Sequence, residues 1–115
     1  MLFRSIVSAD PEREAALIGE HVLYQTNQYV AWGAFGPPDQ VPQFADATAA
    51  LRDGLYQLST PVAAVARLSA MLKQYPQIVD VHFWAQFPGE SVASGSRRIE
   101  ILATQVLPQL RAALA

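Results

Sequence analysis

The sequence predicts an α/β fold in which short parallel strands alternate with helices. Two observations lead to this class. Apolar strand-like segments and segments of helical periodicity follow one another in the order strand, helix, helix, short strand, helix, strand, helix. Strands separated by helices are joined by right-handed crossovers, which make neighbouring strands parallel. The length of 115 residues and the hydrophobic content of 51% suit one domain over residues 1–115 with its own core.

The amino-terminal part of the chain predicts a strand followed by a long helix. Residues 2–9 contain β-branched and aromatic side chains and end at an Asp-Pro pair, as is typical of a strand that enters a turn. The helix is expected over 10–33, with Asp10 as its N-cap and Pro11 in the first helical position. Glycines and prolines after this segment end the helix.

The middle of the chain predicts a helix, a short strand and a second helix after a proline-rich loop. These segments cover residues 45–54, 55–58 and 59–76 respectively. In the last of them, Ser59 or Thr60 is suited to cap the helix and Pro61 to begin it. Apolar residues then recur at helical spacing, which indicates one buried face.

The segment VDVHFWAQF alternates apolar and polar side chains and predicts a strand over about 78–87. Side chains on a strand change faces at every residue. The face that we expect to enter the core comprises Val79, Val81, Phe83, Ala85 and Phe87. The opposite face carries an acid, an imidazole, an indole and an amide, from Asp80, His82, Trp84 and Gln86.

His82 is the main candidate for chemistry, because imidazole can act as a general base or as a hydrogen-bond donor to a ligand near neutral pH. Asp80 on the same face would orient the ring if the rotamers bring the two together. The alternative interpretation is a histidine on a half-exposed strand face or at a subunit contact. His21, in the middle of the first helix, is interpreted as a surface or interface residue. The two histidines form no metal-binding motif, so no metal site is predicted.

The carboxy-terminal segment predicts a helix over 97–115 after a loop of small residues over 88–96. Pro108 is expected to kink this helix or to remove one of its turns. Arg97 and Arg98 would open the helix, so the backbone amides there are candidates for holding a phosphate. A flexible helix entry is the alternative interpretation of the same residues.

Composition excludes several classes of function. Cysteine is absent, which excludes disulfides, thiol nucleophiles and cysteine-ligated metal sites. The net charge of −2 and the scattered basic residues argue against a nucleic-acid partner. The chain lacks a signal peptide and a long apolar segment, so we expect a soluble cytoplasmic protein with no membrane partner. The charged content of only 16% is typical of a surface that a partner covers in part.

The second half of the chain contains three short motifs in a characteristic order. These are Thr60-Pro61, Pro88-Gly89 and VLPQLR at 106–111. In order and spacing they resemble the carboxy-terminal portion of the bacterial luciferase-like flavin-dependent monooxygenases. The segments RSIVSADPEREA and YVAWGAFG of the first half also fit the strand and helix that precede this portion in the family. Ser59 departs from the glycine that the family commonly has before Thr-Pro, which puts a close approach of cofactor or substrate at that turn in doubt.

The resemblance implies a fold and a set of site residues. The fold would be a partial TIM-barrel-like (β/α) unit with two to three parallel strands and four helices, which is the last third of a barrel. The cofactor would be FMN or a related flavin, and the reaction a monooxygenase (oxidoreductase) reaction. His82 would be catalytic, and Trp84, Gln86 and Arg97 would bind the cofactor. A closed barrel needs eight strands and about 250 residues, so we expect an incomplete flavin site, or no cofactor, in this chain alone.

A small sheet with open edges favours pairing with another chain. We therefore expect a homodimer or higher oligomer, with the polar strand face or a strand edge at the contact. The other candidate partner is a separate chain that supplies the missing barrel strands. Two functions besides a flavin enzyme stay open, namely a non-catalytic self-associating α/β domain and a small-ligand binding module that uses the 80–86 strand face.

Overall fold

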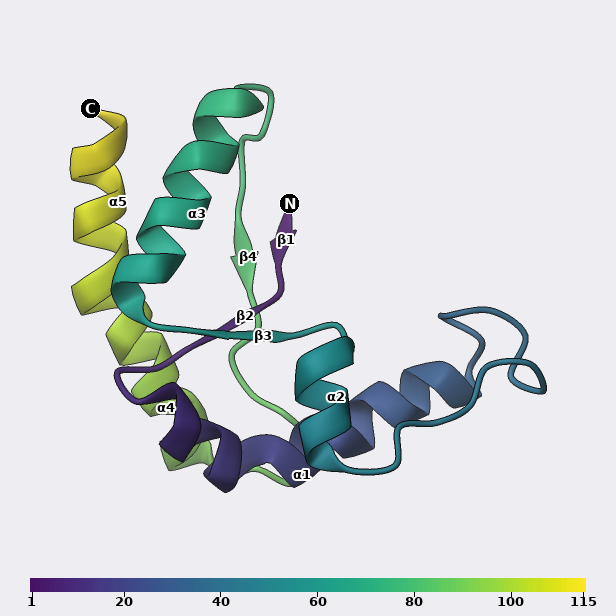
Figure 1. Cartoon of the computed structure of the whole chain (residues 1–115). Helices are drawn as coiled ribbons and strands as arrows, with labels where there is room; N and C mark the ends of the chain where they lie inside the picture. Colours follow the sequence, from purple (N-terminus) through teal and green to yellow (C-terminus); the bar gives the residue numbers. More distant parts are fainter.

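The computed structural model describes residues 1–115 and confirms the α/β class with parallel strands (Figure 1). One central amino-terminal segment is divided into β1 (Leu2–Phe3) and β2 (Ser5–Val7), which belong to two separate two-stranded sheets. β1 pairs in parallel with β4 (His82–Phe83), and β2 pairs in parallel with β3 (Gln57–Ser59). The central segment thus pairs with a different strand along each of its two halves.

The third predicted strand is much shorter than expected. The alternating segment predicted a strand over 78–87, but only His82–Phe83 pair with a neighbour. The backbone beyond them bonds to side chains instead of to another strand. Arg98 donates to the carbonyl of Ala85 at 2.9 Å, and the Phe87 N–H donates to the carboxylate of Glu90 at 3.0 Å. These bonds satisfy the polar backbone groups without a sheet ladder.

The first three helices lie close to their predicted bounds, and the first and third confirm their predicted N-caps. They are α1 (Pro11–Ala31), α2 (Ala47–Asp53) and α3 (Pro61–Gln74). The side chain of Asp10 accepts a hydrogen bond from Arg13 N–H at the start of α1. Of the two candidates for the start of α3, Thr60 is the cap, because its hydroxyl accepts from the Ala63 N–H. Caps of this kind satisfy N–H groups that the first helical turn leaves free.

The last helix begins earlier than predicted. It starts at Val92, with Ser91 as N-cap, whereas the sequence indicated a loop up to residue 96. α4 (Val92–Ile101) continues through a π-helical turn, η1 (Leu102–Val106), into α5 (Leu107–Leu114). Pro108 lacks an N–H and its ring crowds the preceding turn. The wider π turn accommodates it, so the helix loses regularity without ending.

The two faces of the central segment enter two different hydrophobic clusters. Phe3 and Val7 pack with α3 and α5. Ile6 faces the other way and packs with α1, Tyr56 and Phe87. The predicted apolar face of residues 79–87 is therefore only partly correct. Its first member, Val79, is 89% exposed, and its last, Phe87, belongs to the cluster on the opposite side.

The molecule is elongated, and its two small sheets do not close into a barrel. Its principal extents are 47 × 31 × 20 Å, and its radius of gyration of 15.1 Å exceeds the roughly 13 Å typical of a compact domain of this length. The helices α3, η1 and α5 lie on one side of the strands, and the loop that follows α1 extends away from them (Figure 1). No helix is both long enough and apolar enough to cross a membrane.

Candidate functional site

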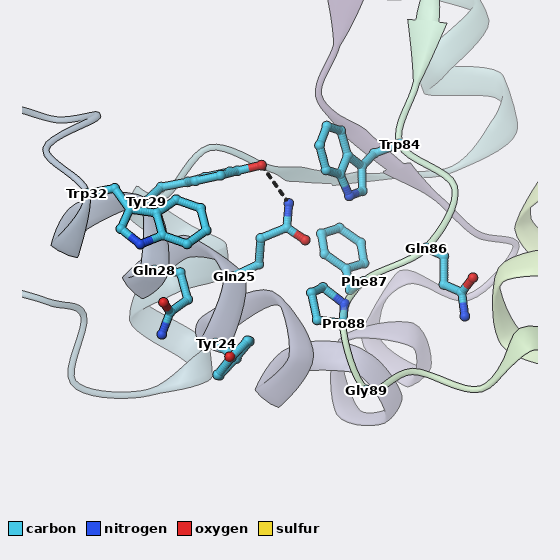
Figure 2. Close-up of a pocket in the computed structure, with 10 residues that line it drawn as sticks. All are labelled: Tyr24, Gln25, Gln28, Tyr29, Trp32, Trp84, Gln86, Phe87, Pro88 and Gly89. Carbon is cyan, nitrogen blue, oxygen red and sulfur yellow. Dashed lines mark hydrogen bonds between the residues drawn. The ribbon is translucent and has the colours of Figure 1, made fainter.

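An aromatic cleft of about 640 Å³ lies between the carboxy-terminal half of α1 and the segment after β4 (Figure 2). This volume is within the range of small-molecule sites. Ten residues line the cleft: Tyr24, Gln25, Gln28, Tyr29, Trp32, Trp84, Gln86, Phe87, Pro88 and Gly89. Five of them carry aromatic rings, and three carry side-chain amides. We call this site the aromatic cleft.

Helical spacing places the α1 wall of the cleft. Gln25, Tyr29 and Trp32 follow one another at intervals of four and three residues, which brings their side chains to one face of a helix. The rings of Tyr29 and Trp32 are 5.8 Å apart between centroids. Trp32 is 72% exposed, so its ring is accessible to a ligand in the cleft.

The second wall of the cleft is fixed by packing on Tyr56. Its ring contacts Trp84 at 5.8 Å and Phe87 edge-on at 5.0 Å. The chain then turns at Gly89, whose φ of +83° favours glycine. A Cβ at this glycine would lie 3.0 Å from Nδ1 of His21, so this imidazole lies at the rim of the cleft.

A small polar network holds the floor of the cleft. The amide of Gln25 donates to the hydroxyls of Tyr56, at 3.0 Å, and Tyr29, at 3.2 Å. Burial, with a smaller contribution from Tyr29, raises the pKa of Tyr56 to about 12, so its phenol stays protonated. The indole N–H of Trp84 is buried and has no hydrogen-bond partner. The amide of Gln28 is also free of hydrogen bonds within the chain.

The structure brings two of the predicted site residues together and leaves two apart. Trp84 and Gln86 both line the aromatic cleft, although the Gln86 amide donates to the carbonyl of Glu90. His82 is exposed on β4 and does not line the cleft, and no hydrogen bond joins it to Asp80. Arg97 lies in the middle of α4 and lines a separate cavity.

The predicted phosphate site at the helix entry is wrong in its location. Because α4 begins at Val92, the backbone amides at Arg97 and Arg98 lie inside the helix. The true entry is capped by Ser91, whose hydroxyl accepts from the Ser94 N–H. Whether the Arg97 side chain contacts a cofactor stays a prediction.

Arg98 forms a buried ion cluster that sequence reasoning missed. It is only 1% exposed and pairs with Glu14 at 2.7 Å and with Glu90. Glu90 also accepts hydrogen bonds from the Ser94 hydroxyl and the Phe87 N–H. The cluster therefore joins α1, α4 and the segment 85–90, which is one wall of the cleft. Glu14 sits in the first turn of α1, where the sequence suggests only an interaction with the helix dipole.

Acid is expected to weaken this cluster through Glu90. Burial acts to raise its pKa, but hydrogen bonds from Arg98, Ser94 and the Phe87 N–H outweigh burial and lower it. A pKa that is lower in the folded state gives stability that is complete above the ordinary value of 4.5 and is lost as the pH falls through the folded-state pKa. Urea titrations should therefore show the free energy of unfolding falling from about pH 5 downwards. Glu90→Gln should flatten this dependence, and an unchanged slope in that variant would contradict the assignment.

Comparison with known protein families, with curated proteins and with solved structures finds no match to this chain. The described side chains also include no group of three or more His, Asp and Glu that could hold a metal ion. The chemistry of the aromatic cleft is therefore the best indication of what this chain binds.

Proposed function

We propose that this chain binds a planar heteroaromatic ligand of the flavin type in the aromatic cleft, and that it contributes one wall of a luciferase-like flavin-dependent monooxygenase site. The observation that carries this proposal is the gathering of five aromatic rings from two distant segments around one open cleft. Aromatic side chains bind flat π-systems by stacking and edge contacts. The resemblance to the luciferase-like family supplies the choice of flavin among such ligands.

The residues of the cleft suit an isoalloxazine ring but not its phosphate. Trp32, Tyr29 and Trp84 offer ring faces and edges, and the unpaired amide of Gln28 offers a donor and an acceptor for the heteroatoms at the ring edge. None of the ten lining residues is cationic. A phosphate bound with this ring would therefore extend into solvent, unless Arg97 reaches it from outside the cleft.

The chain's own contribution to a reaction is binding and orientation. A bound flavin supplies the electron-transfer and oxygen chemistry of such enzymes. Among the lining residues only tyrosines can titrate, and Tyr56 behind them is held protonated. His21 at the rim is the histidine placed for proton transfer at this cleft, whereas His82 would need a ligand at the edge of β4. We therefore propose that turnover requires residues from a partner chain.

Titration with oxidised FMN tests the binding proposal by calorimetry and by tryptophan emission. Both tryptophans of the chain line the cleft, so bound flavin should quench most of the emission. Trp32→Ala and Trp84→Ala should each weaken binding about fivefold, because each removes a ring contact worth about 1 kcal/mol. Tyr75→Ala is the matched control. This partly exposed tyrosine lies at the carboxy-terminal end of α3 and does not line the cleft, so the variant should bind FMN as tightly as wild type.

Comparing FMN with riboflavin separates the ring from the phosphate. Equal affinities are expected if the cleft binds the ring alone. A marked preference for FMN that Arg97→Ala removes would instead assign the phosphate to that arginine. If neither compound binds the wild-type chain, the flavin proposal fails. The unclosed sheet and the lack of an acid or base in the cleft would then favour the second candidate, a non-catalytic self-associating domain.

A further inference from the structure

The helix that ends the chain carries an exposed apolar stripe. It consists of Ile99, Ala103, Leu107 and Leu114, which are all exposed and follow one another at helical spacing from α4 to α5. Ile99, Ala103 and Leu107 of this stripe also line a groove of about 240 Å³, whose seven lining residues are all apolar. One of them is Phe83 of β4, so the groove adjoins a strand that pairs on one side only.

The exposed area of the molecule indicates that a partner covers part of it. The chain exposes 6884 Å², whereas a compact monomer of 12.6 kDa exposes about 6,200 Å². The excess of roughly 700 Å² is close to the roughly 800 Å² that each partner buries in a standard interface. The groove is lined by apolar residues alone, which makes the stripe and groove a suitable place for this contact.

Two charged residues beside the stripe favour a second copy of this chain as the partner. Glu100 and Arg111 are exposed, and neither forms an ion pair within the chain. They lie near opposite ends of the stripe. If a second copy packs antiparallel about a two-fold axis near residue 106, Glu100 of each copy faces Arg111 of the other. The same axis places Ile99 against Leu114, so apolar and charged residues match in one register.

We propose that this chain forms a homodimer in which the stripes of two copies pack antiparallel, with Glu100 and Arg111 paired across the two-fold axis. The contact is isologous, because one patch meets its own copy. It lies on the α4–α5 side of the molecule, and none of its residues lines the aromatic cleft. The dimer thus leaves that cleft open, and the inference stands independently of the proposed flavin binding.

Sedimentation equilibrium of the full chain at micromolar concentrations measures the dimer constant. Ala103→Glu should weaken the dimer by about a hundredfold, because the charge is introduced twice at the apolar contact. Ala112→Glu is the matched control. Ala112 is another exposed alanine of the carboxy-terminal helix, and it lies outside the stripe and the groove. The variant adds the same charge there, so the dimer constant should be nearly unchanged.

A charge exchange tests the antiparallel register. Glu100→Arg or Arg111→Glu alone replaces two attractions by two repulsions and should weaken the dimer about tenfold. The double variant restores both pairs in reverse and should return the constant to within about threefold of wild type. A monomeric wild-type chain at about 100 μM, or a dimer that tolerates Ala103→Glu, would overturn the proposal. A double variant as weak as the single ones would overturn the antiparallel arrangement.

Discussion

Arg98→Met is expected to lower the free energy of unfolding by about 3–5 kcal/mol. The substitution leaves the carboxylates of Glu14 and Glu90 buried without their cation, since both side chains are almost fully shielded from water. It also removes the hydrogen bond to the Ala85 carbonyl. A domain of this size has only about 5–15 kcal/mol of stability, so urea denaturation followed by circular dichroism should show a large fall in the midpoint.

The neighbouring arginine provides a control for this effect. Arg97 is half-exposed and lies 3.9 Å from Glu14, so its contribution is that of a surface ion pair. Arg97→Met should change the free energy of unfolding by less than about 1 kcal/mol. Equal losses in the two variants would show that helix propensity or net charge, and not burial of the cluster, determines the effect.

The ion cluster explains why the segment after β4 holds its shape without a sheet. Strands gain stability from a ladder of backbone hydrogen bonds, but residues 85–90 have no neighbouring strand. Arg98 and Glu90 take the place of that ladder at the Ala85 carbonyl and the Phe87 N–H. Folding of this wall of the aromatic cleft therefore depends on charges that come from α1 and α4.

Local signals in the sequence were sufficient for the first three helices and for the parallel direction of the strand pairs. Asp10 and Thr60, each followed by proline, marked two helix starts within one residue of those observed. The residues before α4 carry a weaker signal, because small side chains in ESVASGS suit a loop as well as a helix. The Ser91 cap is preceded by Glu90, which binds Arg98 eight positions later, a contact that no local pattern shows.

Long-range contacts account for what the sequence did not predict. Strict alternation over 79–87 is a property of the segment alone, whereas strand length also depends on the partner. β1 offers only Leu2 and Phe3 for pairing, so the ladder ends after two residues. The alternation put Trp84 and Gln86 on one strand face, the family resemblance suggested them as site residues, and both line the cleft. Tyr29 and the rim residue His21 were missed, because their relevance depends on how α1 crosses the segment 84–89.

The two hydrophobic clusters make it possible to separate effects on folding stability from effects on ligand affinity at the aromatic cleft. Phe87 belongs to the α1 cluster and lines the cleft, whereas Phe83 belongs to the cluster with α3 and α5. Both are phenylalanines in the same segment, four residues apart. Substitutions at the two positions therefore remove the same type of side chain from two different clusters.

Phe87→Ala is expected to lower the free energy of unfolding by about 3–5 kcal/mol, since the ring is fully buried and packs edge-on to Tyr56 at 5.0 Å. It should also abolish flavin binding, because the second wall of the cleft loses its support. Phe87→Leu keeps most of the volume, so this variant should stay folded and bind flavin several-fold more weakly. Phe83→Ala, whose ring is only partly buried and contacts Phe3, should lose less stability and keep its affinity for flavin. Calorimetric titration of each folded variant measures these affinities. If Phe83→Ala weakens flavin binding as much as Phe87→Leu does, the two clusters form a single cooperative unit.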